Sequence, residues 1–172
     1  DKIDIFVAGQ FDQVYMENFF RSLPFSFCYP KLALDYQQEF SKITREKAER
    51  KEANQSILEL AYHLQVLYTD VNYPALVVFN NLFGSSAHSK LFVQLREREG
   101  LAYTVGSSLH VFSGMMRVYA GIDRKERLRV MKLIRQLLSD MKLGKFTDED
   151  LLLSKKVLTT DAKLAQDRVS TL

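Results

Sequence analysis

The chain has 172 residues, of which 47% are hydrophobic and 26% charged, so the sequence predicts a folded domain rather than a disordered segment. Its formal net charge of +3 is too small to indicate binding to nucleic acid or to an anionic membrane. No run approaches the roughly 20 apolar residues that a membrane-spanning helix needs. The chain opens without methionine on a strand-like run, and we expect it to be a piece of a longer protein with an upstream half.

The first elements follow from local periodicity. Ile3–Val7 alternates in polarity and predicts a strand. Asp12 can cap a helix that extends to about Arg21. We expect three apolar side chains of this helix to face inward: Val14, Phe19 and Phe20.

Cys28 is the only cysteine, so the sequence offers no internal disulfide. A single cysteine fits a reducing compartment, and we expect a cytoplasmic protein. No histidine or aspartate lies beside Cys28 in the sequence, so we interpret it as a small buried hydrophobic residue.

Residues 42–53 allow two interpretations. Their composition favours a helix, but they lack an apolar stripe with which a helix could pack. We therefore expect an extended edge segment that leads into Ser56–Tyr62, which is predicted to be a buried strand.

Two helices are predicted next. The first begins at Tyr73-Pro74 and ends at Gly84, and the second ends at Gly100. The residues expected to face the core are Leu76, Phe79, Asn80 and Phe83 in the first helix, and Leu91, Phe92 and Leu95 in the second.

A hairpin follows, with its turn at Ser113-Gly114. Alternation places Tyr103, Val105, Ser107, Leu109 and Val111 on one face of the first strand, and Met116, Val118, Ala120 and Ile122 on one face of the second.

The last two elements are helices. The first is long and ends at Gly144, and its expected inner face comprises Leu128, Met131, Ile134, Leu138 and Met141. Thr147 and Asp150 form a capping-box pattern at the start of the second. Hairpin strands beside paired helices indicate an α+β fold, with a largely antiparallel sheet and helices packed on one face.

The sequence carries no pattern for an independent catalytic centre. The three histidines, His63, His88 and His110, form neither HExxH nor HxxEH, and a zinc site needs three or four convergent ligands. His63 and His110 are interpreted as structural. Cys-x-x-Cys and Gly-x-Ser-x-Gly are absent, and the run after Gly84 lacks the Gly-Lys-Ser/Thr ending of a phosphate-binding loop. We expect no metal and no cofactor in this chain.

One stretch, residues 81–103 (NLFGSSAHSKLFVQLREREGLAY), closely resembles the second-half signature of the M16 (pitrilysin and processing-peptidase) family. Other pieces fall in the family's order: Gln55-Ser56 before a strand, Tyr73-Pro74-Ala75-Leu76, and Thr147–Leu151 at the start of a helix. The resemblance covers nearly the whole chain. It implies that residues 1–172 are a single inactive, C-terminal-type M16 domain.

The resemblance also implies two site residues. In this family one half carries zinc and HxxEH, while the other contributes an Arg and a Tyr, seven residues apart, that contact the substrate. Arg96 and Tyr103 match that pair. A guanidinium and a phenol are suitable donors to peptide carbonyls and to the negative charge that develops during hydrolysis.

The implied role is a non-catalytic, substrate-binding half whose partners are a peptide and an HxxEH-bearing paralogue or other half that holds the zinc. The run AHSKLF is most similar to bacterial non-catalytic homologues paired with an active paralogue. The family's turn usually has two or more glycines, whereas Gly84 is followed here by Ser85-Ser86.

Two alternatives remain open. The first is a structural or assembly scaffold with the M16 fold and no peptidase role. The second is a nucleic-acid-binding α+β module, which would interleave aromatic and basic residues on one sheet face. The predicted strands carry Met, Val and Ala instead, which argues against this second alternative.

Overall fold

The structure is a computed structural model that describes residues 5–24, 43–50, 52 and 55–165. The chain divides into two compact units, residues 1–35 with 162–172 and residues 36–161, and each is described by itself. The single domain expected over residues 1–172 stays a prediction. Within the described ranges, every helix is too short or too polar to span a bilayer. Cys28 lies outside these ranges.

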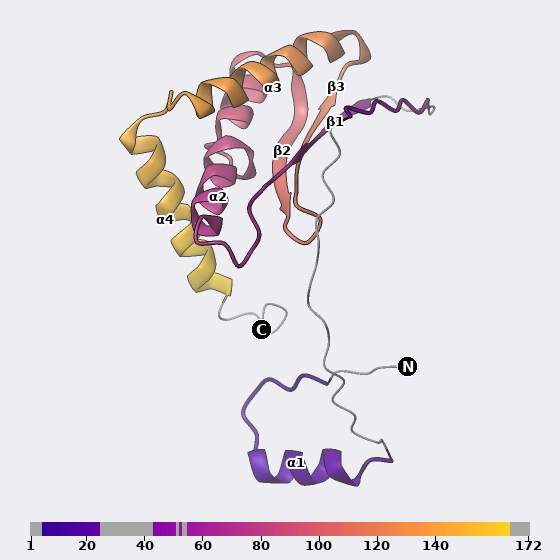
Figure 1. Cartoon of the computed structure of the whole chain (residues 1–172), viewed down its shortest axis with the longest axis vertical. Helices are drawn as coiled ribbons and strands as arrows, with labels where there is room; N and C mark the ends of the chain where they lie inside the picture. Colours follow the sequence, from indigo (N-terminus) through magenta and orange to yellow (C-terminus); the bar gives the residue numbers. More distant parts are fainter. Residues whose placement is uncertain (1–4, 25–42, 51, 53–54, 166–172) are drawn as a thin grey trace. The chain divides into compact units, whose positions relative to one another are not determined.

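The first unit contains helix α1 (Gln13–Ser22, Figure 1). Its predicted cap is confirmed, because the Asp12 carboxylate accepts a hydrogen bond from the Tyr15 amide at 2.8 Å. The strand predicted over Ile3–Val7 is wrong for its described part, since residues 5–8 have no regular structure. A strand needs a hydrogen-bonded neighbour, and residues 5–24 hold none.

The inward-facing side chains predicted for α1 are also largely wrong. Val14 and Phe19 are exposed, at 68% and 47%, and Phe20 is half-buried. The residues from 5 to 24 contain no second element against which this face can pack. The periodicity therefore predicted the helix correctly but not which of its side chains are buried.

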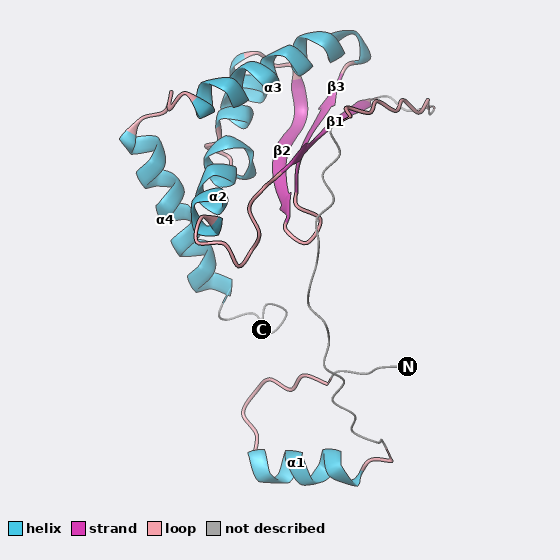
Figure 2. Cartoon of the chain, in the orientation of Figure 1, coloured by secondary structure: helices cyan, strands magenta, loops and turns pink. Residues whose placement is uncertain are grey.

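The second unit is built on an antiparallel sheet in the order β1-β3-β2 (Figure 2). Its strands are β1 (Ser56–His63), β2 (Ala102–His110) and β3 (Met115–Ile122). The predicted hairpin joins β2 to β3, and its turn contains Gly114 with a φ of +58°. The α+β fold with an antiparallel sheet is confirmed.

Helical segments form the second layer of this unit (Figures 1 and 2). Helix α2 (Tyr73–Asn80) continues into a π-helical turn, η1 (Asn81–Ser85). A second π-helical segment, η2 (Phe92–Arg98), precedes β2. A 3₁₀ turn, η3 (Arg124–Glu126), leads into α3 (Arg127–Lys142), and α4 (Asp148–Ala165) follows.

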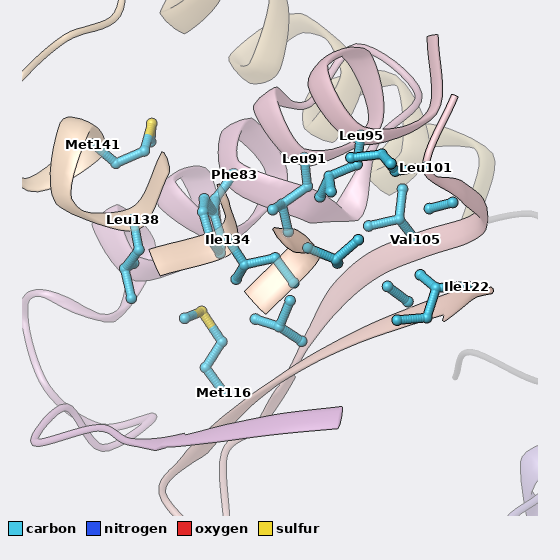
Figure 3. Packing of buried hydrophobic residues seen from close by; sticks show 14 of the residues in the cluster. Phe83, Leu91, Leu95, Leu101, Val105, Met116, Ile122, Ile134, Leu138 and Met141 are labelled. Carbon is cyan, nitrogen blue, oxygen red and sulfur yellow. The ribbon is translucent and has the colours of Figure 1, made fainter. Parts of the chain in front are cut away.

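The core lies between this helical layer and one face of the sheet. Figure 3 shows the side chains of both layers pointing toward one another. The fully buried residues of the core include Phe83, Leu91, Leu95, Val118, Ala120, Ile122, Val130 and Ile134. The predicted inner face of β3 is therefore confirmed.

The predicted inner face of α3 is wrong at its first residue. Leu128 is 69% exposed, whereas Val130 is fully buried and continues the stripe through Ile134, Leu138 and Met141. Because α3 has apolar residues in more than one helical register, its packing against the sheet decides which register is buried.

Two predictions concern the segment around β1. The strand exists, but it is half-buried rather than buried: its residues alternate, and Ile57 is 73% exposed. It pairs only with β3 among the described residues, so one face and one edge remain open. Residues 43–50 form neither a helix nor a hydrogen-bonded β-strand. The helical interpretation is therefore excluded for this part of residues 42–53.

Candidate functional site

The predicted site residues lie on either side of one tight turn. Arg96 is near the end of η2, and Tyr103 is the second residue of β2. The Leu101 amide donates to the Leu95 carbonyl at 2.8 Å, which closes the chain between them. Gly100 makes this closure possible with a φ of +60°, a conformation that few other residues adopt without strain. The predicted end of the helix at Gly100 is confirmed.

Arg96 is exposed, and its guanidinium lies over the Phe92 ring, 4.9 Å from the ring centroid. Phe92 lies one helical turn earlier, so the ring supports the side chain along the helix surface. Among the described residues no carboxylate pairs with Arg96. Its N–H groups therefore remain available to another molecule.

Tyr103 does not share a face with Val105, which corrects the alternation predicted for this strand. Ala102 stands opposite Ile122 and Thr104 opposite Gly121, so Tyr103 is the extra residue of a β-bulge. The bulge leaves Ala102 on the buried face and turns Tyr103 outward, where it is 62% exposed.

Side-chain contacts tie the turn to α3. The Glu99 carboxylate accepts from Gln94 at 3.2 Å and from Arg129 at 2.8 Å. Arg129 also lies 3.7 Å from Glu126. Each exposed pair contributes only about 0–1 kcal/mol, but together they limit the positions that the turn can take.

Close packing fixes η1 against β2. A Cβ added to Gly84 would lie 2.5 Å from the Ser107 hydroxyl oxygen and 2.7 Å from Leu91, so only glycine fits. The Ser107 hydroxyl donates to the buried Asn80 side-chain oxygen at 2.7 Å. The helical path ends at Ser85, one residue beyond the predicted end at Gly84, but Gly84 lacks the positive φ of a helix-ending glycine and serves close packing instead.

The start of the second helical segment is anchored to α4. Lys90 donates to Asp150 at 2.6 Å, with both side chains about 30% exposed. The predicted capping box is confirmed, because Asp150 accepts from the Thr147 amide at 2.9 Å and the Thr147 hydroxyl accepts from the Asp150 amide at 3.1 Å. The Lys90 hydrogen bond, followed by the Thr147 amide, holds the pKa of Asp150 below its ordinary value.

The described residues do not fit a zinc ion. They contain no group of three His, Cys, Asp or Glu side chains close enough to bind a metal. His63 and His110 both stand opposite Met115, one on each side of β3, while His88 lies in the exposed loop before η2. Three convergent ligands are the minimum for a protein zinc site, so no metal-dependent step is assigned to these residues.

Sequence reasoning missed the residues that support the turn, namely Glu99 and Arg129. Glu99 and Arg129 are 30 positions apart, and no local pattern connects them. The only sequence signal was the concentration of basic residues at the start of α3.

The family model described as the peptidase M16 inactive domain matches residues 1–158. The chain belongs to the peptidase M16 family. A probable inactive metalloprotease, YmfF, from Bacillus subtilis is 37% identical over 114 residues, which cover 66% of this chain and 27% of YmfF. An uncharacterized zinc protease from the same bacterium, YmxG, is 36% identical over 47% of this chain and 20% of its own length.

Solved structures share the fold of this chain. A conserved protein from Enterococcus faecalis V583 matches with a TM-score of 0.85 and 38% identity, over 94% of this chain and 38% of that one. A peptidase M16 inactive domain from Pseudomonas fluorescens shares the fold, with a TM-score of 0.58 and 22% identity over 63% of this chain and 27% of that one. The chain thus spans well under half the length of these relatives.

Proposed function

We propose that this M16 chain is the substrate-binding, non-catalytic part of a composite zinc peptidase. In this proposal Arg96 and Tyr103 contact a peptide held at the zinc site of an HxxEH-bearing M16 paralogue or other half. The observation that carries the proposal is that one closed turn presents both side chains to solvent, with no hydrogen-bonding or ionic partner among the described residues.

The chemistry of the pair suits this role. A guanidinium offers several N–H donors in a fixed plane, and a phenol offers one O–H donor. Peptide carbonyls are acceptors, and the scissile carbonyl gains negative charge when it is attacked. Arg96 and Tyr103 would therefore bind the peptide backbone and stabilise that charge, while the partner supplies the zinc-bound nucleophile.

The relatives' names are consistent with this division of roles. One relative is called a probable inactive metalloprotease and others are called zinc proteases. We place the metal in the catalytic partner, because the described residues here offer no zinc ligand set. We further propose a cytoplasmic complex that acts on peptides or unfolded segments.

The test is peptide turnover by the two-component complex with variants of this protein. Arg96→Ala should lower kcat/KM roughly 10- to 100-fold, because hydrogen bonds to charged groups contribute about 1.5–3 kcal/mol. Tyr103→Phe should lower it less, and Arg96→Lys should restore little, since lysine lacks the planar set of donors.

Arg98→Ala is the matched control. Arg98 is also an exposed arginine of η2 without an ion-pair partner among the described residues, and its removal should change kcat/KM less than about twofold. If Arg96→Ala and Tyr103→Phe behave like Arg98→Ala, the substrate-contact role is wrong and a scaffold role becomes the better explanation.

A further inference from the structure

A hollow beside the Arg96–Tyr103 turn has no role in the proposed function so far. It is lined by Glu99, Arg129, Lys132, Leu133 and Gln136, and we call it the α3 hollow. Glu99 lines the hollow and lies in the turn between Arg96 and Tyr103, so the hollow borders the proposed peptide-binding residues.

The charged groups of the α3 hollow are unequally satisfied. Both oxygens of the Glu99 carboxylate are engaged, one by Gln94 and the other by Arg129. Arg129 in turn lies between Glu99 and Glu126. Lys132 forms no ion pair with any described residue. The unsatisfied charge of the hollow is therefore the positive charge of Lys132.

The surrounding surface has the same sign. Residues 123–136 contain six basic side chains and two acidic ones, and the carboxylates of Glu46 and Glu99 pair with Arg127 and Arg129 of this segment, which leaves a local net charge of +2. Summed charges of one sign raise the local concentration of ligands of the opposite sign. A basic ligand would have to displace Arg129 from Glu99 and would face Lys132 as well, so the arrangement favours an anion.

The uncharged lining suits a side chain rather than a free ion. Leu133 is half-buried and offers an apolar wall for methylene groups, and Gln136 also lines the hollow. An aspartate or glutamate side chain has this combination of an apolar stem and an anionic end.

We propose that the α3 hollow is a specificity subsite that accepts an acidic side chain of the peptide, with Lys132 as its principal partner. This inference rests on the proposed function, in which Arg96 and Tyr103 hold the peptide nearby. It names the substrate class of the site as peptides with a carboxylate side chain near the segment that contacts Arg96.

The test is equilibrium binding to the full-length protein, which needs no turnover. The probes are fluorescein-labelled decapeptides in which one glutamate moves along a neutral sequence, each with a glutamine counterpart. At one position the glutamate version should bind about fivefold more tightly, the factor that corresponds to about 1 kcal/mol for an exposed ion pair. Salt should reduce this preference.

Variants of α3 identify the group responsible. Lys132→Met should reduce the preference to less than about twofold, and Lys132→Glu should reverse it, because the sign of the charge changes. Lys142→Met is the matched control: Lys142 is an exposed lysine at the other end of the same helix and should leave the preference unchanged.

Arg96→Ala separates this inference from the proposed function. It should weaken both peptide versions equally and leave their ratio intact. If Arg96→Ala changes nothing while Lys132→Met still abolishes the preference, the subsite stands and the proposed role of Arg96 fails. If neither Lys132 variant changes the ratio, or if no glutamate position is preferred by the wild-type protein, the subsite is wrong.

Discussion

The Leu101 amide donates to the Leu95 carbonyl at 2.8 Å, and this hydrogen bond joins the end of η2 to the start of β2. Arg96 directly follows Leu95, and Tyr103 comes two residues after Leu101. Because Leu95 and Leu101 are both buried in the core, the turn between them has a fixed base. The two exposed side chains therefore depend on the core for their positions.

Gly100 tests this dependence, since its φ of +60° lets the turn close. Gly100→Ala should cost about 1–2 kcal/mol of stability, because the left-handed conformation disfavours a Cβ, and should also lower kcat/KM of the complex. Gly144→Ala is the control: its φ is +72°, and neither glycine has an atom within 4 Å of an added Cβ.

Both glycine variants should therefore unfold at lower denaturant concentration than the wild type, but only Gly100→Ala should lose activity. Equal activity of the two variants would show that the geometry of this turn does not matter to the substrate.

A substitution at Gly84 tests the packing of η1 against β2. Gly84→Ala would place a Cβ 2.5 Å from the Ser107 hydroxyl oxygen and 2.8 Å from the Ser107 Cβ. Overpacking of this kind typically costs about 1–3 kcal/mol, which denaturant unfolding can measure. Ser85→Ala, one residue later and exposed, should change stability by less than about 0.5 kcal/mol. A Gly84→Ala protein as stable as the wild type would contradict the close contact of η1 with β2.

Asp150 links stability to pH. Its pKa is lowered in the folded protein, chiefly by the hydrogen bond from Lys90, so its carboxylate stabilises the fold above the unfolded-state pKa of about 3.9. This contribution is lost as the pH falls through the lower, folded-state pKa. Asp150→Asn should therefore cost up to about 1 kcal/mol at pH 7, the usual size of a partly exposed ion pair such as Lys90–Asp150, and less in acid.

Urea unfolding of the wild type and Asp150→Asn from pH 7 downward gives the required comparison. The difference in unfolding free energy should stay constant to about pH 5 and shrink below about pH 4. A difference that persists unchanged in strong acid would mean that the charge of Asp150 is not what stabilises the cap.

Sequence periodicity predicted the hairpin, α1 to α4 and the capping box, because each has a strong local signal such as Thr147 three residues before Asp150. It placed Tyr103 on the wrong face because a bulge adds one residue without changing the alternation that precedes or follows it. It chose Leu128 over Val130 because the register of α3 depends on contacts with distant elements.

The candidate pair Arg96 and Tyr103 came from the resemblance to a family and not from periodicity. The supports around it could not be predicted in the same way. The Glu99–Arg129 contact and the α3 hollow exist only once α3 packs beside the turn. Long-range pairs of this kind leave no trace in the spacing of a single sequence.

The most direct test of the central claim is peptide cleavage by the HxxEH-bearing M16 paralogue from the same organism, with and without the full-length protein that contains this chain. We predict that cleavage appears only when both are present, and that Arg96→Ala in the non-catalytic component lowers it. Cleavage by the paralogue alone at the same rate, or no cleavage in any mixture, would contradict a substrate-binding role.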